Sequence, residues 1–201
     1  MMQIPSRIAL TVALAGLAMF AFAGTAASAS SAQTSGSAAT SYTCTAVTPK
    51  GTFSDSVTAT FTGTTPASVA VGDTVPISEF QAHLAVPGSL LDQAYSEGVR
   101  SITAGVSAFD INATDATTST LNIVKSVVKI GTLKLASANN PSLNVNIPRN
   151  PVKVGGWVAS QSGTMTFTPG NATFQFKTHA GSLSVPCTTS SPAPISITTV
   201  T

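Results

Sequence analysis

The sequence is poor in charged residues, in histidine and in cysteine. Of 201 residues, 8% are charged, with nine Lys or Arg against seven Asp or Glu, and the chain has two His and two Cys. Such low, nearly balanced charge excludes a nucleic-acid binder that depends on a clustered basic face. The hydrophobic share of 43% excludes a disordered polyelectrolyte. With so few His and Cys we expect neither a metal site nor a cofactor.

No hydrophobic run in the sequence is long enough to span a membrane. The longest one lies near the N-terminus, from Ile8 to Ala23, and falls short of the roughly 20 residues that a membrane-spanning helix needs. Small residues follow it and end in Ala27-Ser28-Ala29, which matches the cleavage pattern of a secretory signal peptide. We therefore predict a signal peptide over residues 1–29, no membrane span after its removal, and a secreted, extracellular or cell-wall location.

The two cysteines stand near the two ends of the predicted mature chain, at Cys44 and Cys187. An even number of cysteines in an exported chain predicts a disulfide, and here only one pairing within the chain exists. The absence of a C-x-x-C spacing argues against a redox-active pair. We predict a disulfide between Cys44 and Cys187 that clamps the ends of the fold together.

Most of the chain alternates between apolar and polar residues with a period of two. In Thr52–Thr62 the apolar residues share one parity and Ser and Thr the other, which predicts a half-buried strand. In Ser101–Ile111 the apolar parity switches, which predicts a bulge near Ser107. Further strands are expected at Tyr42–Val47, Ile77–Val86, Leu121–Ile130, Leu133–Ala136, Leu143–Ile147 and Gly181–Cys187.

Two segments predict local structures of their own. Gly163–Lys177 favours a hairpin with Pro169-Gly170 at its turn and Phe167, Phe174 and Phe176 on its buried face. Ser89 is a suitable N-cap for one short helix, with Gly98 as its end.

Together these elements predict an all-β fold. We expect an antiparallel β-sandwich over residues 42–188, with an immunoglobulin-like arrangement and one short helix. Residues 30–41 consist mostly of Ser, Ala and Thr, which predicts a flexible leader. Residues 189–201 predict a tail, in which Ile195–Val200 is either a loose final strand or disordered.

Three stretches are distinctive as a set: Ser41-Tyr42-Thr43-Cys44-Thr45, the segment from Thr64 to Gly72 with Pro66-Ala67-Ser68-Val69-Ala70-Val71, and Leu183-Ser184-Val185-Pro186-Cys187. Together they resemble a family of secreted actinobacterial proteins whose domain has no assigned function. The resemblance spans residues 41–188. It implies export and a β-rich domain with clamped ends, and it implies no catalytic residues.

Few side chains could support catalysis. His83 has the parity opposite to Leu84 and Val86 and should face solvent, and His179 lies in a turn. No G-x-S-x-G motif supplies a nucleophile for either of them. A glycosidase needs two carboxylates across a cleft, and the sequence singles out no pair among Asp55, Asp73, Glu79, Asp92, Glu97, Asp110 and Asp115.

Two weaker patterns have structural alternatives. Asp110–Asp115 places oxygen ligands at alternate positions as a calcium loop does, but it lacks the central Gly, and Leu121 stands where the bidentate acid belongs. A polar turn is the alternative. Tyr42, Phe80 and Trp157 could form a sugar-stacking platform or belong to the core.

The leading hypothesis is a non-catalytic secreted or cell-envelope-associated β-domain with a structural, adhesive or binding role. Its expected partners are cell-wall glycans or envelope proteins rather than nucleic acid. The alternative is a small secreted hydrolase with an unrecognised site, and a third hypothesis is a pore formed by oligomerisation. Convergence of any two of the His and carboxylate side chains in one pocket would favour the hydrolase.

Overall fold

The computed structural model describes residues 32–48, 51–126, 128–136, 139–179 and 181–201, so the predicted signal peptide lies outside the described residues. The single helix in this part of the chain is α1 (Gly88–Ser96). The strands are β1 (Gln33–Thr48), β2 (Gly51–Pro66), β3 (Ser68–Val69), β4 (Thr74–Val86), β5 (Ser101–Ala113), β6 (Thr120–Asn122), β7 (Val128–Lys134), β8 (Leu143–Val158), β9 (Gly163–Thr178), β10 (Gly181–Thr188) and β11 (Ser196–Val200).

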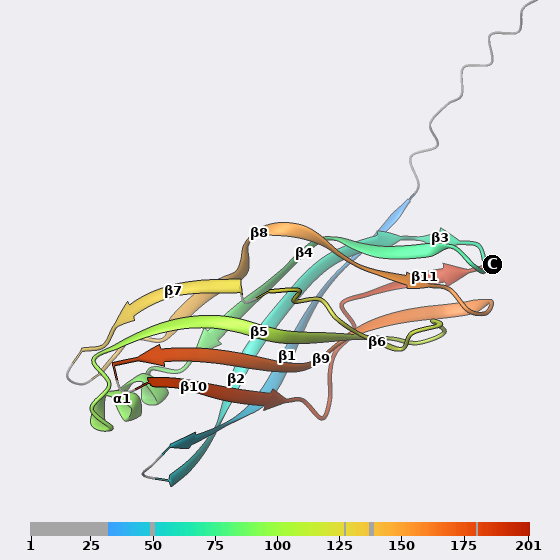
Figure 1. Cartoon of the computed structure of the whole chain (residues 1–201). Helices are drawn as coiled ribbons and strands as arrows, with labels where there is room; N and C mark the ends of the chain where they lie inside the picture. Colours follow the sequence, from blue (N-terminus) through green and yellow to red (C-terminus); the bar gives the residue numbers. More distant parts are fainter. Residues whose placement is uncertain (1–31, 49–50, 127, 137–138, 180) are drawn as a thin grey trace, which may run out of the picture. The chain divides into compact units, whose positions relative to one another are not determined.

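The strands form one hydrogen-bonded sheet. Its main path runs β3-β11-β9-β10-β1-β2-β4-β8, and β5 adds to β9 and carries β6 and β7. All ladders are antiparallel except the short β11–β3 pair. The sheet curls until two of its edge strands, β7 and β8, lie next to each other (Figure 1).

This architecture confirms the predicted all-β, antiparallel, sandwich-like fold with one short helix. Apolar side chains from the curled sheet pack against one another in one core cluster. The continuous path of strands differs from the two separate sheets of an immunoglobulin domain.

The predicted flexible leader is wrong for residues 33–41. They form the first half of β1 and pair with β2 from Gln33 opposite Pro66 onward. Ala38, Thr40 and Tyr42 alternate into the interior and are each no more than 3% exposed. Small residues resemble a linker in composition, but here their size is required: a Cβ added to Gly36 would lie 1.8 Å from the carbonyl oxygen of Ile195.

The predicted hairpin at Pro169-Gly170 is also wrong. β9 runs straight through both residues as one strand. Before Pro169 it pairs with β11, and from Ala172 onward it pairs with β10. Its register against β5 shifts here by an extra residue, which marks a bulge. The Pro-Gly pair therefore marks the point where β9 changes its partner from β11 to β10 while it stays paired with β5.

Other local predictions agree with the structure. The β5–β9 register shifts between Val106 and Ala108, which confirms the bulge at Ser107. Phe167 and Phe174 are buried, and Phe176 is partly buried against the core. The final residues form strand β11, the ordered alternative for the predicted tail, and Ser196, Thr198 and Val200 face inward from it.

The helix is present, but its start differs from the prediction. Pro87 occupies the N-cap position, and no side chain caps the first turn, so Ser89 is not the cap. Gly98 follows the helix with φ of 92° and donates its N–H to the Tyr95 carbonyl, as expected of a helix-ending glycine. Asp92 accepts hydrogen bonds from the Asn140 N–H at 2.8 Å and from Asn140 Nδ2 at 2.6 Å, which fix the helix to the segment before β8. These bonds lower the pKa of Asp92.

Candidate binding cavity

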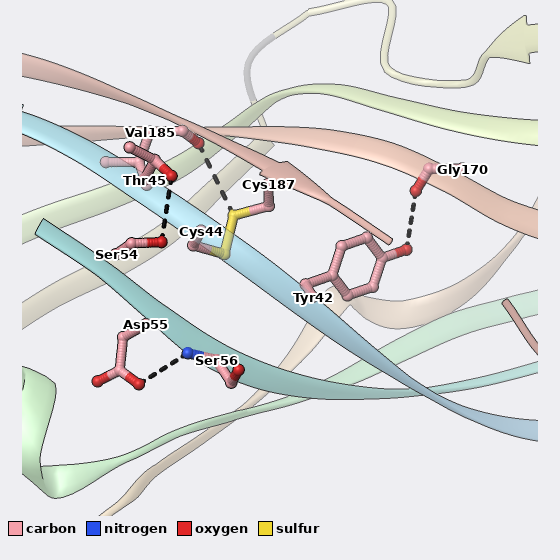
Figure 2. Close-up of a disulfide and its surroundings, with 9 residues drawn as sticks. All are labelled: Tyr42, Cys44, Thr45, Ser54, Asp55, Ser56, Gly170, Val185 and Cys187. Carbon is pink, nitrogen blue, oxygen red and sulfur yellow. Dashed lines mark hydrogen bonds between the residues drawn. A yellow bond between two sulfur atoms is a disulfide. The ribbon is translucent and has the colours of Figure 1, made fainter. Parts of the chain in front are cut away.

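The predicted disulfide is present and joins two neighbouring strands. Cys44 on β1 and Cys187 on β10 are register partners, with an S–S distance of 2.01 Å and a Cα–Cα distance of 4.0 Å. Figure 2 shows the bond and Tyr42 two residues away. The Tyr42 hydroxyl donates to the Gly170 carbonyl at 2.9 Å, and burial raises the pKa of Tyr42. The disulfide ties β1 to its neighbour β10, and the Tyr42 hydrogen bond ties β1 to β9.

The interior beside the disulfide is not fully filled. One hollow, which we call the seam cavity, has a volume of about 200 Å³. It lies between the middle of the sheet and the two edges formed by the β6–β7 segment and by β8. The residues that line it from these edges are Ile123, Val124, Val128, Ile147, Pro148, Val152 and Val154.

A second hollow, the helix-end cavity, has a volume of about 220 Å³. Helix α1 and the residues that follow the helix contribute Leu90, Leu91, Ala94 and Val99 to the lining of this cavity. From the sheet, its lining includes Ala46, Phe53, Ile102, Ile130, Leu133, Val145, Phe176 and Leu183. The alternating apolar positions of many strands therefore converge on one space.

The two cavities share a boundary. Cys44, Val57, Leu84 and Phe174 line both of them. The disulfide therefore stands where the two hollows meet, and the interior is apolar from the seam to the helix end. An apolar void of this size is costly to keep empty, because its lining lacks packing partners.

One carboxylate enters this apolar lining. Asp55 on β2 is the register partner of Cys44, is half-buried and lines the helix-end cavity. Its carboxylate accepts the N–H of Ser56 at 2.7 Å, as Figure 2 shows. Among the residues that the structure describes, no Asp, Glu, Lys, Arg or His lines the seam cavity.

The two histidines are placed on different elements. His83 is exposed on β4, and its Nδ1 lies 2.8 Å from Asn146 Oδ1 on β8. His179 is exposed in the turn between β9 and β10. Neither residue lines the seam cavity or the helix-end cavity.

The carboxylates are likewise distributed over separate elements. Asp73 accepts the Ala70 N–H at 2.9 Å in a turn, and Asp92 belongs to α1. Of the seven, Asp55 alone lines either cavity. Within the described ranges, no group of three or more His, Cys, Asp or Glu could hold a metal ion.

The segment proposed as a calcium loop uses its oxygens in local hydrogen bonds. Asn112 Oδ1 accepts the Thr120 hydroxyl at 2.8 Å, and Asp115 accepts Gln161 Nε2. Asp110 lies within β5. This arrangement is the polar strand end and turn that the sequence offered as the alternative.

The three aromatic residues of the predicted stacking platform belong to the core. Tyr42, Phe80 and Trp157 are 3%, 2% and 0% exposed, so they cannot form a sugar-stacking surface. Phe61 stacks on Phe109 with ring centroids 5.3 Å apart. The core alternative is therefore confirmed.

Sequence reasoning missed the cavities, although it identified several residues that line them. Val57 and Phe174 were expected on buried strand faces, and both are buried. Whether facing side chains meet or leave a void depends on the curvature of the sheet and on residues far apart in sequence. The signal that could have been used is the number of small Ala and Val residues on the inward faces.

No family model and no curated protein matches the sequence. Among solved structures, the fold is similar to one described as "Putative membrane anchored protein from Corynebacterium diphtheriae", with a TM-score of 0.53 and 19% sequence identity. The match covers 82% of this chain and 37% of that chain, so this chain spans well under half of the neighbour's length. No helix within the described residues is long and apolar enough to cross a membrane.

Proposed function

We propose that this chain is a non-catalytic, exported β-domain that binds an apolar ligand or partner group in its interior cavity. The observation that carries the proposal is the pair of adjoining apolar hollows that meet at the disulfide. Ligand sites are typically concave, mainly apolar and formed before the ligand arrives. The disulfide holds the cavity wall in place at the boundary between the two hollows.

The exported location is supported by three observations. Disulfides persist in oxidising compartments outside the cytoplasm, and Cys44 and Cys187 are paired here. The description of the structural neighbour as membrane anchored agrees with a role at the cell envelope. The resemblance to secreted actinobacterial proteins in residues 41–188 points the same way.

A neutral fluorescent probe tests the binding role. N-phenyl-1-naphthylamine brightens in apolar surroundings, and we expect a saturable rise in its fluorescence with the purified protein. Ala82→Phe should weaken this binding by filling the seam cavity, which Ala82 lines. Ala39→Phe is the matched control, because Ala39 is exposed on β1.

Two results would contradict the proposal. One is the absence of saturable binding by the folded wild-type protein. The other is equal binding by Ala82→Phe and Ala39→Phe when circular dichroism shows both to be folded. The non-catalytic part has its own test: hydrolysis of an ester, peptide or glycan that His83→Ala or His179→Ala abolishes would overturn it.

A further inference from the structure

The charged residues are segregated along the sequence. All seven Asp and Glu lie between Asp55 and Asp115. From residue 116 to the end the chain carries no carboxylate side chain and six cations, Lys125, Lys129, Lys134, Arg149, Lys153 and Lys177. This second segment contains β7 and β8, which are edge strands of the curled sheet.

In the described part of the chain, the curled sheet is not closed by hydrogen bonds between the edge strands β7 and β8, so an opening in the hydrogen bonding lies between them. β7 pairs with β5 and β8 pairs with β4, and no ladder joins β7 to β8 within the described residues. The two strands nevertheless lie next to each other and approach each other in Figure 1. The seam cavity is lined from both of these edges.

Four cations flank the lining of this opening. On one edge, Lys125 follows Val124 and Lys129 follows Val128, and both lysines are exposed. On the other edge the exposed cations are Arg149, next to Pro148, and Lys153, between Val152 and Val154. Each cation is therefore one residue away from a side chain that lines the seam cavity.

Carboxylates balance this charge only in part. Glu79 precedes Phe80, and Asp110 follows Phe109; both aromatic residues line the seam cavity. Glu79 and Asp110 belong to β4 and β5, which are paired on both sides, and not to the edges that border the opening. The edges themselves carry positive charge alone.

The charges around the two cavities would orient an anionic ligand. Among the described residues of the seam lining, Tyr42 carries the one hydroxyl, which donates to the Gly170 carbonyl. Asp55 lines the helix-end cavity, on the other side of the shared boundary, and its negative charge would repel an anionic ligand group there. An anionic group is therefore favoured at the seam and disfavoured at the helix end, whereas hydrocarbon suits the space between them.

We infer that the seam between β7 and β8 admits an anionic amphiphile, with its hydrocarbon chain in the two cavities and its carboxylate or phosphate head between the edge cations. This inference rests on the proposed function and names its ligand class. An apolar cavity of about 150 Å³ accommodates benzene, so a hollow of about 200 Å³ that continues into a second one accommodates a longer chain.

Displacement of N-phenyl-1-naphthylamine tests the inference. The competitors are dodecanoate, a lysophosphatidylglycerol and the neutral monododecanoylglycerol, all below their micelle concentrations. We expect at least one of the anions to bind roughly tenfold more tightly than the neutral competitor at low salt, with the advantage shrinking as salt rises. The tighter of the two anions identifies the head as carboxylate or phosphate.

The double variant Arg149→Glu/Lys153→Glu assigns the effect to the seam. It should weaken anion binding by roughly tenfold and leave the neutral competitor unchanged. Lys177→Glu is the control, since Lys177 is exposed on β9 and adjoins no residue of the seam lining. Circular dichroism and thermal melting establish that each variant is folded.

The outcomes separate this inference from the proposed function. Equal affinity of neutral and anionic competitors, or equal losses in the double variant and in Lys177→Glu, would overturn the anionic head while leaving the binding cavity intact. If neither the probe nor any amphiphile binds the folded protein, the proposed function itself fails.

Discussion

The two ends of the β-sheet core differ in how completely they are filled. Around β11 and the start of β9, Trp157, Met165, Phe167 and Ile195 are all 0% exposed, and the Trp157 and Phe167 rings meet edge to face at 5.2 Å. We call this the packed end. The hollow end, around the seam and helix-end cavities, has walls of the same apolar residue types but keeps two voids.

The difference indicates separate roles for the two ends. At roughly 24 cal/mol per Å³, an empty cavity of about 200 Å³ corresponds to at most roughly 5 kcal/mol of lost stability. A domain tolerates such a loss where binding needs the space. The packed end then supplies stability from close contact, and the hollow end depends more on the disulfide.

The largest effect is expected from removing the disulfide. A crosslink between residues 143 positions apart is worth roughly 5 kcal/mol through the entropy of the unfolded chain. Cys44→Ser/Cys187→Ser should therefore lose roughly that much free energy of unfolding in guanidinium denaturation. Reductant should destabilise the wild type and leave the double variant unchanged. Equal midpoints for the wild type and the double variant would show that the hollow end does not depend on the clamp.

The next effect compares one phenylalanine from each end. Phe167→Ala should cost about 4–5 kcal/mol, because the tightly packed neighbours cannot close the new void. Phe174→Ala should cost less, about 3 kcal/mol, because Phe174 already borders both cavities. Urea denaturation of the two variants provides the comparison. A larger loss at Phe174 would reverse the assignment of packed and hollow ends.

A smaller effect is expected from replacing glycine with alanine, and comparing two glycines separates side-chain crowding from backbone strain. A Cβ added to Gly155 would lie 1.8 Å from the buried Trp157 ring, whereas one added to Gly72 meets nothing within 4 Å. Both glycines have positive φ, 74° and 91°. Gly155→Ala should therefore cost about 3 kcal/mol and Gly72→Ala about 1 kcal/mol. Similar melting temperatures for the two variants would show that the Trp157 ring has room to move.

Local patterns predicted the elements that depend on local chemistry. Alternation located most of the strands, the parity switch located the bulge at Ser107, and Gly98 marked the end of the helix. The predicted export and the even number of cysteines together predicted the disulfide. In each case the residues concerned determine the structure largely by themselves.

The errors arose where distant strands decide the outcome. Residues 33–41 look like a linker until β2 supplies a partner and Ile195 covers Gly36. Pro169-Gly170 reads as a turn until β10 and β11 are both found on β9. The cavities depend on how far the sheet curls, a property of all its strands together.

Methyl NMR provides the most direct test of the central claim that the hollow end alone is a binding site. Dodecanoate, titrated below its micelle concentration, should shift the methyl resonances of Val57, Leu84 and Val145, which line the cavities. The methyl resonances of Val75, Ile195 and Val200 at the packed end should stay in place. Shifts at both ends, or shifts confined to the packed end, would contradict the account.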